Sequence, residues 1–311
     1  LPFLTDPEQC WYWGQRLSQE ISGIAPGGKD IEGKVWPEGR RGLFPPPLKM
    51  EFEKAIDAIF LKPKFYSAYF LDDDGKHKTK TTYDAFGKKI REDKEMLLRG
   101  SILVRRDNCS YTKKVYKPIT INILERIPFE ESWKILFSSV LDLIKGQASL
   151  EDLTMIKGLG DNYKSKTNPM YVFSQYLQSI GKPQEPGSRL PYLVVGTGVD
   201  AVGSKMRLQE QMVEGSCQEK INIEYYLSNV MSGPLDTLIG VGYRDFIEKL
   251  NVSFTARKGC KPTTLLTPVK FIYKYLKYSR VTSSSDKVAL LENLNKMILD
   301  RCAVIRMTTN V

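Results

Sequence analysis

The segment LRGSILVRRDNC, residues 98–109, marks the point where the sequence changes from strand-like to strongly charged. Residues 101–104, Ser-Ile-Leu-Val, are a short strand-like run that predicts a strand. Arg105 and Arg106 follow this run side by side. Two neighbouring cations are costly unless an anionic group is shared between them, so the segment indicates a phosphate or carboxylate partner.

The charge of the whole chain also favours an anionic partner. Its 311 residues contain 46 lysines and arginines against 36 acidic residues, which gives a net charge of +10. Ten basic and four acidic residues lie between residues 88 and 117. A concentrated excess of this kind is typical of proteins that bind nucleic acid, and a solvated basic loop is the alternative.

Composition and the N-terminal sequence restrict the class of protein. With 41% hydrophobic and 26% charged residues, the sequence is typical of a soluble globular protein of one or two domains. Since no run of about 18 apolar residues is present, we expect no transmembrane helix and no membrane partner. The start LPFLTDPEQC lacks the features of a signal peptide, which favours an intracellular protein. Leu1 is not an initiator methionine, so we expect a chain that is processed or cut from something longer.

Several kinds of active site are excluded by residue use. The five cysteines show no CxxC spacing, which favours reduced thiols over disulfides or a zinc site. His77 is the single histidine, so a His-based triad would have to use it. The three aspartates at 72–74 could bind Mg²⁺, but they precede Gly75 and predict a turn between two strands. The pattern GTGVDAVG, residues 196–203, lacks the strand and helix of a dinucleotide fingerprint.

Hydrophobic periodicity divides the chain into a mixed α and β part and a mostly helical part, which predicts an α+β fold. The first part predicts a helix at 6–23 capped by Asp6, a loop at 24–47, and strands at 48–61, 64–71 and 101–104. The second part predicts helices at 129–147, 168–181, 269–278 and 286–305, a short strand within 187–195, and a helix, break and helix over 219–240. Ser149 before LED predicts a helix cap.

Six sequence blocks occur in one order with ordinary gaps between them. They are MEFEK (50–54), KFYSAY (64–69), GSILVRRDNC (100–109), LTMIK (153–157), GSRLPYLV (187–194) and EKINIEYYL (219–227). In this order they resemble the C-terminal portion of a family B DNA polymerase from a large double-stranded DNA virus. The resemblance implies the C-terminal part of a palm domain, with antiparallel strands and helices, over residues 1–125. A mostly α-helical thumb domain would follow over residues 126–311.

The resemblance implies contacts near the catalytic metals and in the minor groove. Glu53 matches a Glu-Lys pair that lies near the Mg²⁺ ions of the family. Lys64 and Tyr66 match a Lys-Lys-x-Tyr motif that contacts the minor groove of the new duplex. Pro63 replaces the first lysine of that motif, and Lys62 directly precedes it. A lysine at this position can test base-pair geometry because minor-groove acceptors lie at similar positions in every correct pair.

The opening segment resembles a Lys-Gly-x-Glu-x-Val-Arg-Arg-Asp motif where the palm meets the thumb. The matching residues are Gly100, Val104, Arg105, Arg106 and Asp107, with Arg99 in place of the lysine and Ile102 in place of the glutamate. The resemblance implies that the arginines hold the palm against the primer strand and that Asp107 bridges one of them.

In the thumb, the resemblance implies three contacts with the duplex backbone and one packed pair. Lys157, Lys164 and Arg189 match residues that approach the DNA phosphates. Tyr225 and Tyr226 match residues of the thumb core, where they pack rather than bind.

As part of such an enzyme, the chain would grip primer–template DNA. The intact polymerase, called the parent enzyme below, would extend the primer with deoxynucleoside triphosphates and Mg²⁺. The family's catalytic aspartates lie in Ser-Leu-Tyr-Pro and Tyr-Gly-Asp-Thr-Asp-Ser motifs, and neither motif occurs in the 311 residues. We therefore expect the chain alone to be inactive. An independent, non-catalytic DNA-binding subunit is one alternative, and a basic structural protein with a chance resemblance is another. The parent would act in the host nucleus or in a cytoplasmic viral factory.

The last predicted helix carries one apolar stripe. Its members are Val288, Leu291, Leu294, Ile298 and Cys302. Such a stripe predicts packing on the rest of the thumb, and docking of a processivity factor is the alternative.

Overall fold

The computed structural model describes residues 7–24, 27–37, 42–44, 48–72, 74–84, 87–198, 200–250, 253–254 and 263–309. The chain divides into two compact units, Leu1–Ser101 and Ile102–Val311. Within the described ranges, no helix combines the length and apolarity needed to cross a membrane.

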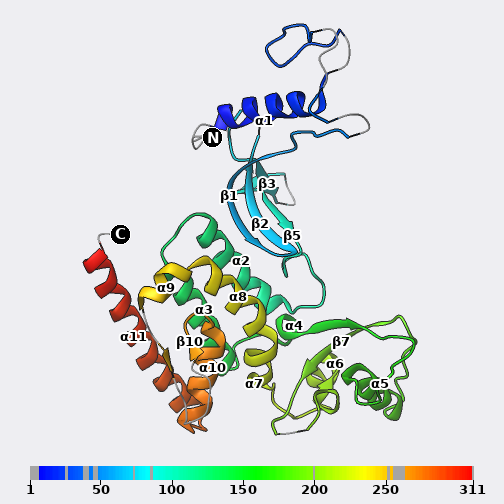
Figure 1. The fold of residues 1–311 in the computed structure, drawn as a ribbon. Coiled ribbons are helices and arrows are strands. Elements are labelled where there is room, and N and C mark those ends of the chain that lie inside the picture. Colours follow the sequence, from blue (N-terminus) through cyan, green and yellow to red (C-terminus); the bar gives the residue numbers. More distant parts are fainter. Residues whose placement is uncertain are drawn as a thin grey trace. The chain divides into compact units, whose positions relative to one another are not determined.

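The first unit is a mixed α and β structure built on a small antiparallel sheet (Figure 1). Its elements are α1 (Pro7–Ser22), β1 (Ala55–Lys62), β2 (Phe65–Leu71), β3 (Thr79–Tyr83), β4 (Lys89–Lys94) and β5 (Met96–Arg99). The helix predicted at 6–23 is confirmed by α1, whereas its predicted cap, Asp6, lies outside the described residues. The strand predicted at 64–71 is confirmed by β2.

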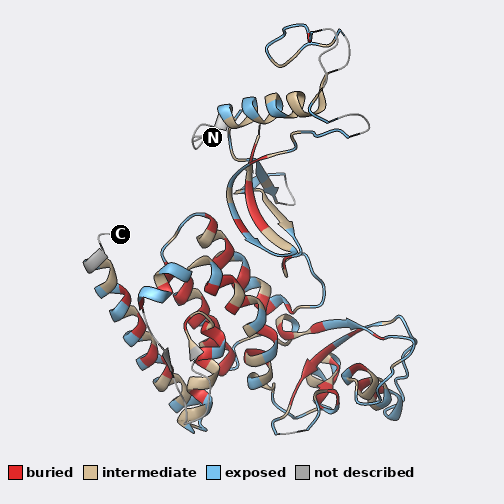
Figure 2. Ribbon diagram, viewed as in Figure 1, coloured by how far each residue is buried: buried red, intermediate tan, exposed pale blue. Residues whose placement is uncertain are grey.

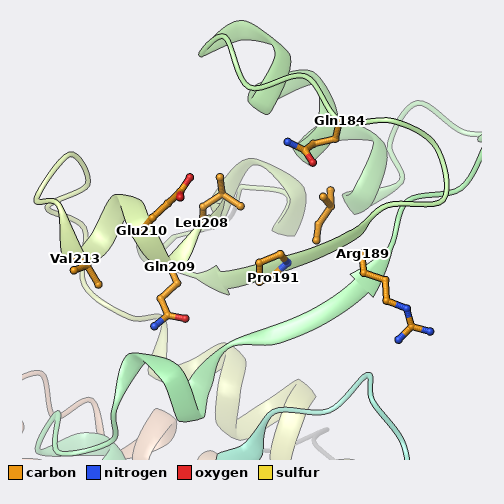
Figure 3. Close-up of a pocket in the computed structure, with 8 residues that line it drawn as sticks. Gln184, Arg189, Pro191, Leu208, Gln209, Glu210 and Val213 are labelled. Atoms are coloured by element: carbon orange, nitrogen blue, oxygen red, sulfur yellow. The ribbon is translucent and has the colours of Figure 1, made fainter.

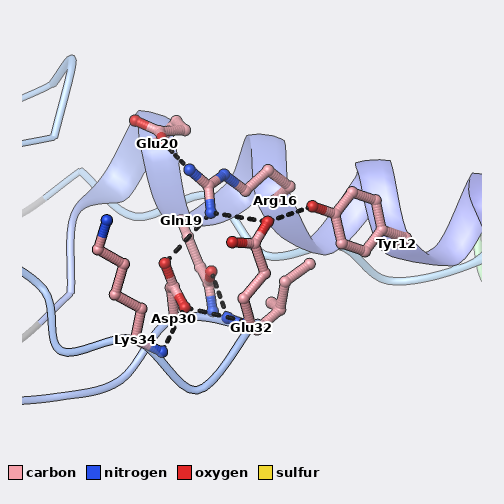
Figure 4. A network of polar contacts seen from close by, with 8 residues as sticks. Tyr12, Arg16, Gln19, Glu20, Asp30, Glu32 and Lys34 are labelled. Carbon is pink, nitrogen blue, oxygen red and sulfur yellow. Dashed lines mark hydrogen bonds and ion pairs between the residues drawn. The ribbon is translucent and has the colours of Figure 1, made fainter.

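A polar network around Arg16 ties α1 to the loop that follows it (Figure 4). The Arg16 guanidinium lies 3.2 Å from Asp30 and 3.6 Å from Glu32, and the Tyr12 hydroxyl donates a hydrogen bond to Glu32. Partial burial would raise the pKa of Asp30, but backbone hydrogen bonds from Lys34 and Glu32, together with Arg16, lower it. The carboxylate therefore stays charged and holds the loop against the helix.

The sheet has the order β1–β2–β5, with β2 in the centre. Its interior side chains are aromatic and small, as expected for a half-buried strand. Phe60 of β1 lies opposite Ser67, and the Phe60 ring packs 5.4 Å from the Phe65 ring.

The prediction of a strand over 48–61 is wrong at its start, because β1 begins at Ala55 and residues 48–54 form no regular element.

The strand predicted at residues 101–104 is wrong. The strand in this region is β5, which ends at Arg99, and residues 102–104 form a turn in which the Arg105 N–H donates to the Ile102 carbonyl at 3.2 Å. The apolar residues at 96–98 supply the pairing with β2 instead. Upstream, the turn predicted after the aspartates is confirmed, since the Gly75 N–H donates to the Asp72 carbonyl at 3.1 Å.

Gly100 and Lys64 approach each other closely at the tip of the β1–β2 hairpin. Lys64 follows Pro63 in a two-residue turn and has a φ of 66°, and Gly100 has a φ of 65°. A Cβ atom on Gly100 would lie 2.4 Å from the Lys64 carbonyl oxygen and 3.0 Å from the Phe65 Cβ. Both the backbone angle and the available space therefore require glycine at this position.

The second unit is mainly helical and contains one three-stranded sheet. Its elements are α2 (Ser110–Leu124), α3 (Phe129–Ile144), α4 (Leu150–Leu153), β6 (Met155–Gly158), α5 (Pro169–Ser179), β7 (Arg189–Val194), the 3-10 helix η1 (Val202–Lys205), β8 (Met206–Arg207), α6 (Gln209–Val213), α7 (Ile223–Tyr225), the π-helix η2 (Tyr226–Met231), α8 (Ser232–Gly242), α9 (Arg244–Leu250), β9 (Ser253–Phe254), β10 (Thr263–Thr264), α10 (Pro268–Ser279) and α11 (Ser284–Thr309). The predicted palm–thumb boundary at residue 125 falls inside this unit, directly after α2.

Buried residues are concentrated in α2, α3, α8 and α10 (Figure 2). The helix predicted at 129–147 is confirmed by α3, whose Trp133, Leu136 and Val140 are completely buried. The Trp133 indole N–H donates to the Asn295 side-chain oxygen of α11 at 2.8 Å. The apolar stripe of α11 is buried at Leu291, Leu294, Ile298 and Cys302, and this helix packs on α3, α9 and α10.

The region predicted as helix, break and helix over 219–240 is a nearly continuous helical run. The helix starts at α7, where the Asn222 side chain accepts from the Tyr225 N–H at 2.9 Å. It widens into the π-helix η2 and continues as α8, with Pro234 as the third residue of α8. Tyr226 is fully buried and donates to the Leu153 carbonyl at 2.9 Å, which confirms the packing role predicted for it.

A buried carboxylate from α8 caps the start of α10. Asp236 accepts a hydrogen bond from the Val269 N–H at 2.7 Å and lies 3.3 Å from the Lys270 N–H. Burial raises the pKa of Asp236 to about 7, although the two N–H groups and the Lys270 charge act in the opposite direction. The folded state therefore binds the Asp236 proton more tightly than the unfolded chain does.

We expect Asp236→Asn to remove a pH dependence of stability. The stabilisation from a protonated Asp236 is complete below about pH 4 and is lost as the pH rises through about 7. The wild-type free energy of unfolding should thus fall between pH 5 and pH 8, by at most about 1.4 kcal/mol per pH unit. Asparagine keeps the acceptor for Val269 and should flatten the profile. Urea titrations at several pH values measure this, and identical slopes in the two proteins would contradict the assignment.

We expect Gly100→Ala to destabilise the sheet by about 2–4 kcal/mol, because it combines a left-handed backbone with a steric clash. Gly87→Ala is the matched control, since Gly87 has a φ of 79° but open space around its Cβ position. It should cost only about 1 kcal/mol. Hydrogen exchange of the β2 and β5 amides reports the local free energy of opening. Equal losses of stability in the two variants would show that the close contact between residue 100 and the Lys64 carbonyl does not contribute to the effect of Gly100→Ala.

Candidate nucleic-acid interface

The tip of the β1–β2 hairpin gathers five of the predicted contact residues. Lys62 ends β1, Lys64 occupies the turn, and Tyr66 lies opposite Arg99 of β5. Directly opposed residues share one face of a sheet, so Tyr66 and Arg99 lie side by side. Gly100 completes the group through its contact with Lys64. The tip thus presents three cations around one tyrosine.

The two aromatic residues at the start of β2 have different roles. Phe65 packs against Phe60 in the interior of the sheet. Tyr66 lies on the other face and is half-buried. Its ring is therefore accessible to a sugar or base, while Phe65 supports the hairpin from behind.

Glu53 does not form a metal site with the residues present. It precedes β1, and its carboxylate lies 2.9 Å from the Lys54 ammonium group. The hydrogen bond from Lys54 and, to a smaller extent, the charge of Arg99 lower the pKa of Glu53. Across the described parts of the chain, no three His, Cys, Asp or Glu side chains come together in a geometry that could hold a metal ion. Glu53 alone therefore does not fit a Mg²⁺ site.

Arg105, Arg106 and Asp107 form an exposed turn in front of α2. The Arg105 carbonyl accepts a hydrogen bond from the Lys113 ammonium group, which fixes the turn on the helix. Asp107 makes no ion pair with either arginine in the described structure. The predicted ion pair between Asp107 and an arginine is therefore not formed. All three side chains are exposed to solvent instead.

Two further cations lie beside this turn and were not singled out in the sequence. Lys113 and Lys117 line a hollow of about 410 Å³ together with Leu103, Ser110 and Pro118. Their spacing of four residues places them on one face of α2. This spacing within the basic stretch 88–117 is the signal that could have identified them.

Lys157 and Arg189 lie on neighbouring strands of the sheet in the second unit. Lys157 is opposite Leu190, and Arg189 is opposite Gly158. Adjacent strand positions point to opposite faces, so the two cations project from opposite sides of the β6–β7 pair. Lys164 is in the following loop, which is held by a hydrogen bond of 2.7 Å from the Gly160 N–H to the Tyr163 hydroxyl.

Arg189 also borders a cavity of about 560 Å³ between β7 and α6 (Figure 3). Leu208, Pro191 and Gln184 surround the hollow, whereas the Arg189 guanidinium points away from Glu210. Glu210 is neutralised by Lys182 at 2.5 Å. The Arg189 charge is therefore presented to solvent rather than used inside the cavity.

The predicted contacts thus fall into three groups. The hairpin tip with Lys62, Lys64, Tyr66, Arg99 and Gly100 belongs to the first unit. The turn at 105–107 and the sheet that carries Lys157, Lys164 and Arg189 belong to the second.

Comparisons with known proteins identify relatives of the chain. DNA polymerase 120R of Invertebrate iridescent virus 3 is 25% identical over 309 residues, an alignment that covers 79% of this chain and 25% of that protein. The DNA polymerase delta catalytic subunit of Caenorhabditis elegans is 24% identical over 216 residues, covering 68% of this chain and 18% of that protein. The structure of the family B DNA polymerase from Pyrobaculum calidifontis matches with 19% identity and a TM-score of 0.38, covering 58% of this chain and 20% of that one.

The chain spans a quarter or less of the length of each of these proteins. A sequence model described as DNA polymerase family B matches residues 28–240. This match covers all six of the sequence blocks and more than half of the chain, so the resemblance is not a matter of chance. The chain belongs to DNA polymerase family B.

Proposed function

We propose that the chain is the part of a viral family B DNA polymerase that grips the primer–template duplex. Residues 1–125 would be the C-terminal part of the palm and residues 126–311 the thumb. The observation that carries this proposal is a set of exposed cations that have no ion pair in the described structure, at the positions that match the family's DNA contacts. They are Lys64, Arg99, Arg105, Arg106, Lys157, Lys164 and Arg189.

These cations contrast with other basic residues of the second unit. Lys114 lies 2.7 Å from Asp152, and Arg207 lies 2.8 Å from Glu219. A cation that already pairs with a carboxylate of the chain attracts an anionic ligand less strongly than an unpaired cation does. The unpaired set can neutralise phosphates and release counterions, which supports binding that is independent of sequence.

The hairpin tip supports a more specific contact. Lys64 is held in a left-handed turn against Gly100, so its backbone position is fixed before any ligand arrives. A lysine fixed in this way can meet the minor-groove acceptors of the newly formed base pairs, and Tyr66 can pack beside a sugar. In this proposal Arg105 and Arg106 bind the phosphates of the primer strand.

The chemistry of the parent enzyme needs groups that these residues do not supply. Mg²⁺ would neutralise the triphosphate and assist the attack of the primer hydroxyl. The side chains described above bind and orient the duplex and do not take part in that step. We infer that the aspartates and the nucleotide site belong to other parts of the parent, which acts in the host nucleus or a viral factory. The buried stripe of α11 favours a packing role over docking of a processivity factor.

We expect Lys64→Ala, Arg105→Ala and Lys157→Ala each to weaken binding of a primer–template duplex. Each lost phosphate contact should lower the slope of log affinity against log salt by about 0.9. Lys64→Ala, as a groove contact, should reduce affinity with a smaller change in slope. Fluorescence anisotropy with a labelled duplex at several salt concentrations measures both quantities.

Lys145→Ala is the matched control for this titration. Lys145 is exposed at the end of α3, has no ion pair in the described structure, and matches none of the family's contacts. Its loss changes the net charge by the same amount and should leave the affinity nearly unchanged. An effect equal to that of Arg105→Ala would show that only the overall charge matters.

We also expect the purified chain to incorporate no nucleotide into a primed template with Mg²⁺ and all four deoxynucleoside triphosphates. The reason is that neither of the family's aspartate motifs occurs in its sequence. Primer extension on a sequencing gel, with an intact family B polymerase as positive control, measures this. Extension that co-purifies with the chain through a second column would contradict it.

A further inference from the structure

A second cleft lies away from the residues assigned to DNA. It has a volume of about 450 Å³ and is formed by the loop between α2 and α3, the start of α3, α9 and the last turns of α11. We call it the α9 cleft and define it by Arg126, Phe129, Tyr243, Phe246, Lys249 and Ile305. Its size is within the range of roughly 300–1,000 Å³ that is typical of ligand pockets.

The floor of the α9 cleft is aromatic. The Phe129 ring lies 5.7 Å from the Phe246 ring and 5.6 Å from the Tyr243 ring. The Tyr243 hydroxyl donates to the Ile127 carbonyl at 3.1 Å and lies 2.7 Å from the Ser132 hydroxyl. The polar end of Tyr243 is therefore satisfied inside the protein. Phe129 is only 2% exposed and supports the floor from behind, so the half-buried rings of Tyr243 and Phe246 supply the ring surface that a ligand can reach.

The rim of the cleft is cationic. Arg126 and Lys249 are exposed, and neither makes an ion pair in the parts of the chain that the structure describes. Arg306 also lines the cleft, but Glu130 neutralises it with two hydrogen bonds of 2.6 Å. Asp245 is the one acidic side chain among the lining residues. The two unpaired cations therefore outnumber the single carboxylate.

Arg126 holds an unusual backbone conformation. It follows the C-cap of α2 with a φ of 56°, and the Ile127 N–H donates to the Asn122 carbonyl at 2.8 Å. Glycine is the usual residue at this position of a helix end because it adopts the left-handed region without strain. The chain instead keeps a strained arginine whose side chain lines the cleft. Strain of this kind concentrates at functional sites.

We propose that the α9 cleft binds an acidic segment of a partner protein that carries an aromatic side chain. The aromatic group packs on Phe246 and Tyr243, and flanking carboxylates pair with Arg126 and Lys249. Arg126 and Lys249 are exposed at the rim of the cleft. Carboxylates of the partner can therefore pair with them at the rim while the aromatic ring of the partner enters the cleft. This inference does not depend on the duplex-binding role, because none of its residues belongs to that interface.

The test uses the full chain and a synthetic hexapeptide, Glu-Asp-Phe-Glu-Asp-Leu, blocked at both ends. Isothermal titration calorimetry should show one binding site. A peptide with serine in place of phenylalanine and leucine, and a peptide with amides in place of the carboxylates, should each bind at least about tenfold more weakly. Equal heats from all three peptides would overturn the proposal.

Arg126→Gly is the decisive variant, since glycine keeps the left-handed backbone and relieves its strain. It should preserve the circular dichroism spectrum and reduce peptide affinity about tenfold. Arg280→Gly is the matched control: Arg280 has a φ of 59° at the end of α10 and lies outside the cleft. It removes the same charge and the same strain and should leave peptide affinity unchanged.

Phe246→Ala gives a second measurement, and a folded variant should again lose about tenfold in affinity. Equal losses in the Arg126→Gly and Arg280→Gly proteins would overturn the proposal. So would a loss of duplex affinity in Arg126→Gly with unchanged peptide binding, which would place Arg126 in the nucleic-acid interface. Failure of the Lys64→Ala titration with intact peptide binding would contradict the duplex role alone.

Discussion

The close approach of Gly100 to the Lys64 carbonyl is the contact on which the candidate interface depends. It joins the end of β5 to the tip of the β1–β2 hairpin, two segments that are distant in sequence. The approach leaves no space for a side chain at residue 100 and fixes where Lys64 and Tyr66 lie relative to Arg99. The positions of these three candidate contact residues are thus set by backbone atoms.

The distribution of ion pairs separates two populations of basic residues. Some, such as Lys114 and Arg207, are neutralised by carboxylates within the chain and contribute to local structure. Others, such as Arg106 and Lys157, have no such partner in the part of the chain described. Net charge alone cannot distinguish these populations, because it counts both equally. The arrangement of carboxylates around each cation decides which charges remain available to a ligand.

Much of the helical part of the fold could be predicted from the sequence, because helix periodicity and capping are local properties. The stripe of α3 and the Ser149 cap, which accepts from the Asp152 N–H at 3.1 Å, are examples. The strand prediction at 101–104 failed because three apolar residues after a serine do not distinguish a strand from a turn. The strand that the structure contains here is β5, which forms by pairing with β2. This pairing joins segments that are distant in sequence, so local residue patterns do not reveal it.

The candidate site was predictable in part. Motif matches located Lys64, Tyr66 and Gly100, and the structure brings them to one hairpin tip. The same matches implied that Asp107 bridges an arginine, but side-chain directions in an exposed turn do not follow from residue order. The cations of α2 could have been found from their four-residue spacing within the basic stretch 88–117, whereas the α9 cleft could not, because its lining residues come from segments far apart in sequence.

The π-helix between α7 and α8 has a consequence for how this region can vary. Its wider turn contains one residue more than a regular α-helical turn, and it buries Tyr226, Leu227, Val230 and Met231. Deleting one residue there would let a regular α-helical turn replace the π turn, with little change in the direction of the residues that follow, because the wider turn already accommodates the extra residue. The buried side chains of α8, and the Asp236 cap on α10, would then keep their directions. A deletion of one residue should therefore be tolerated better within this segment than within the regular helices on either side of it.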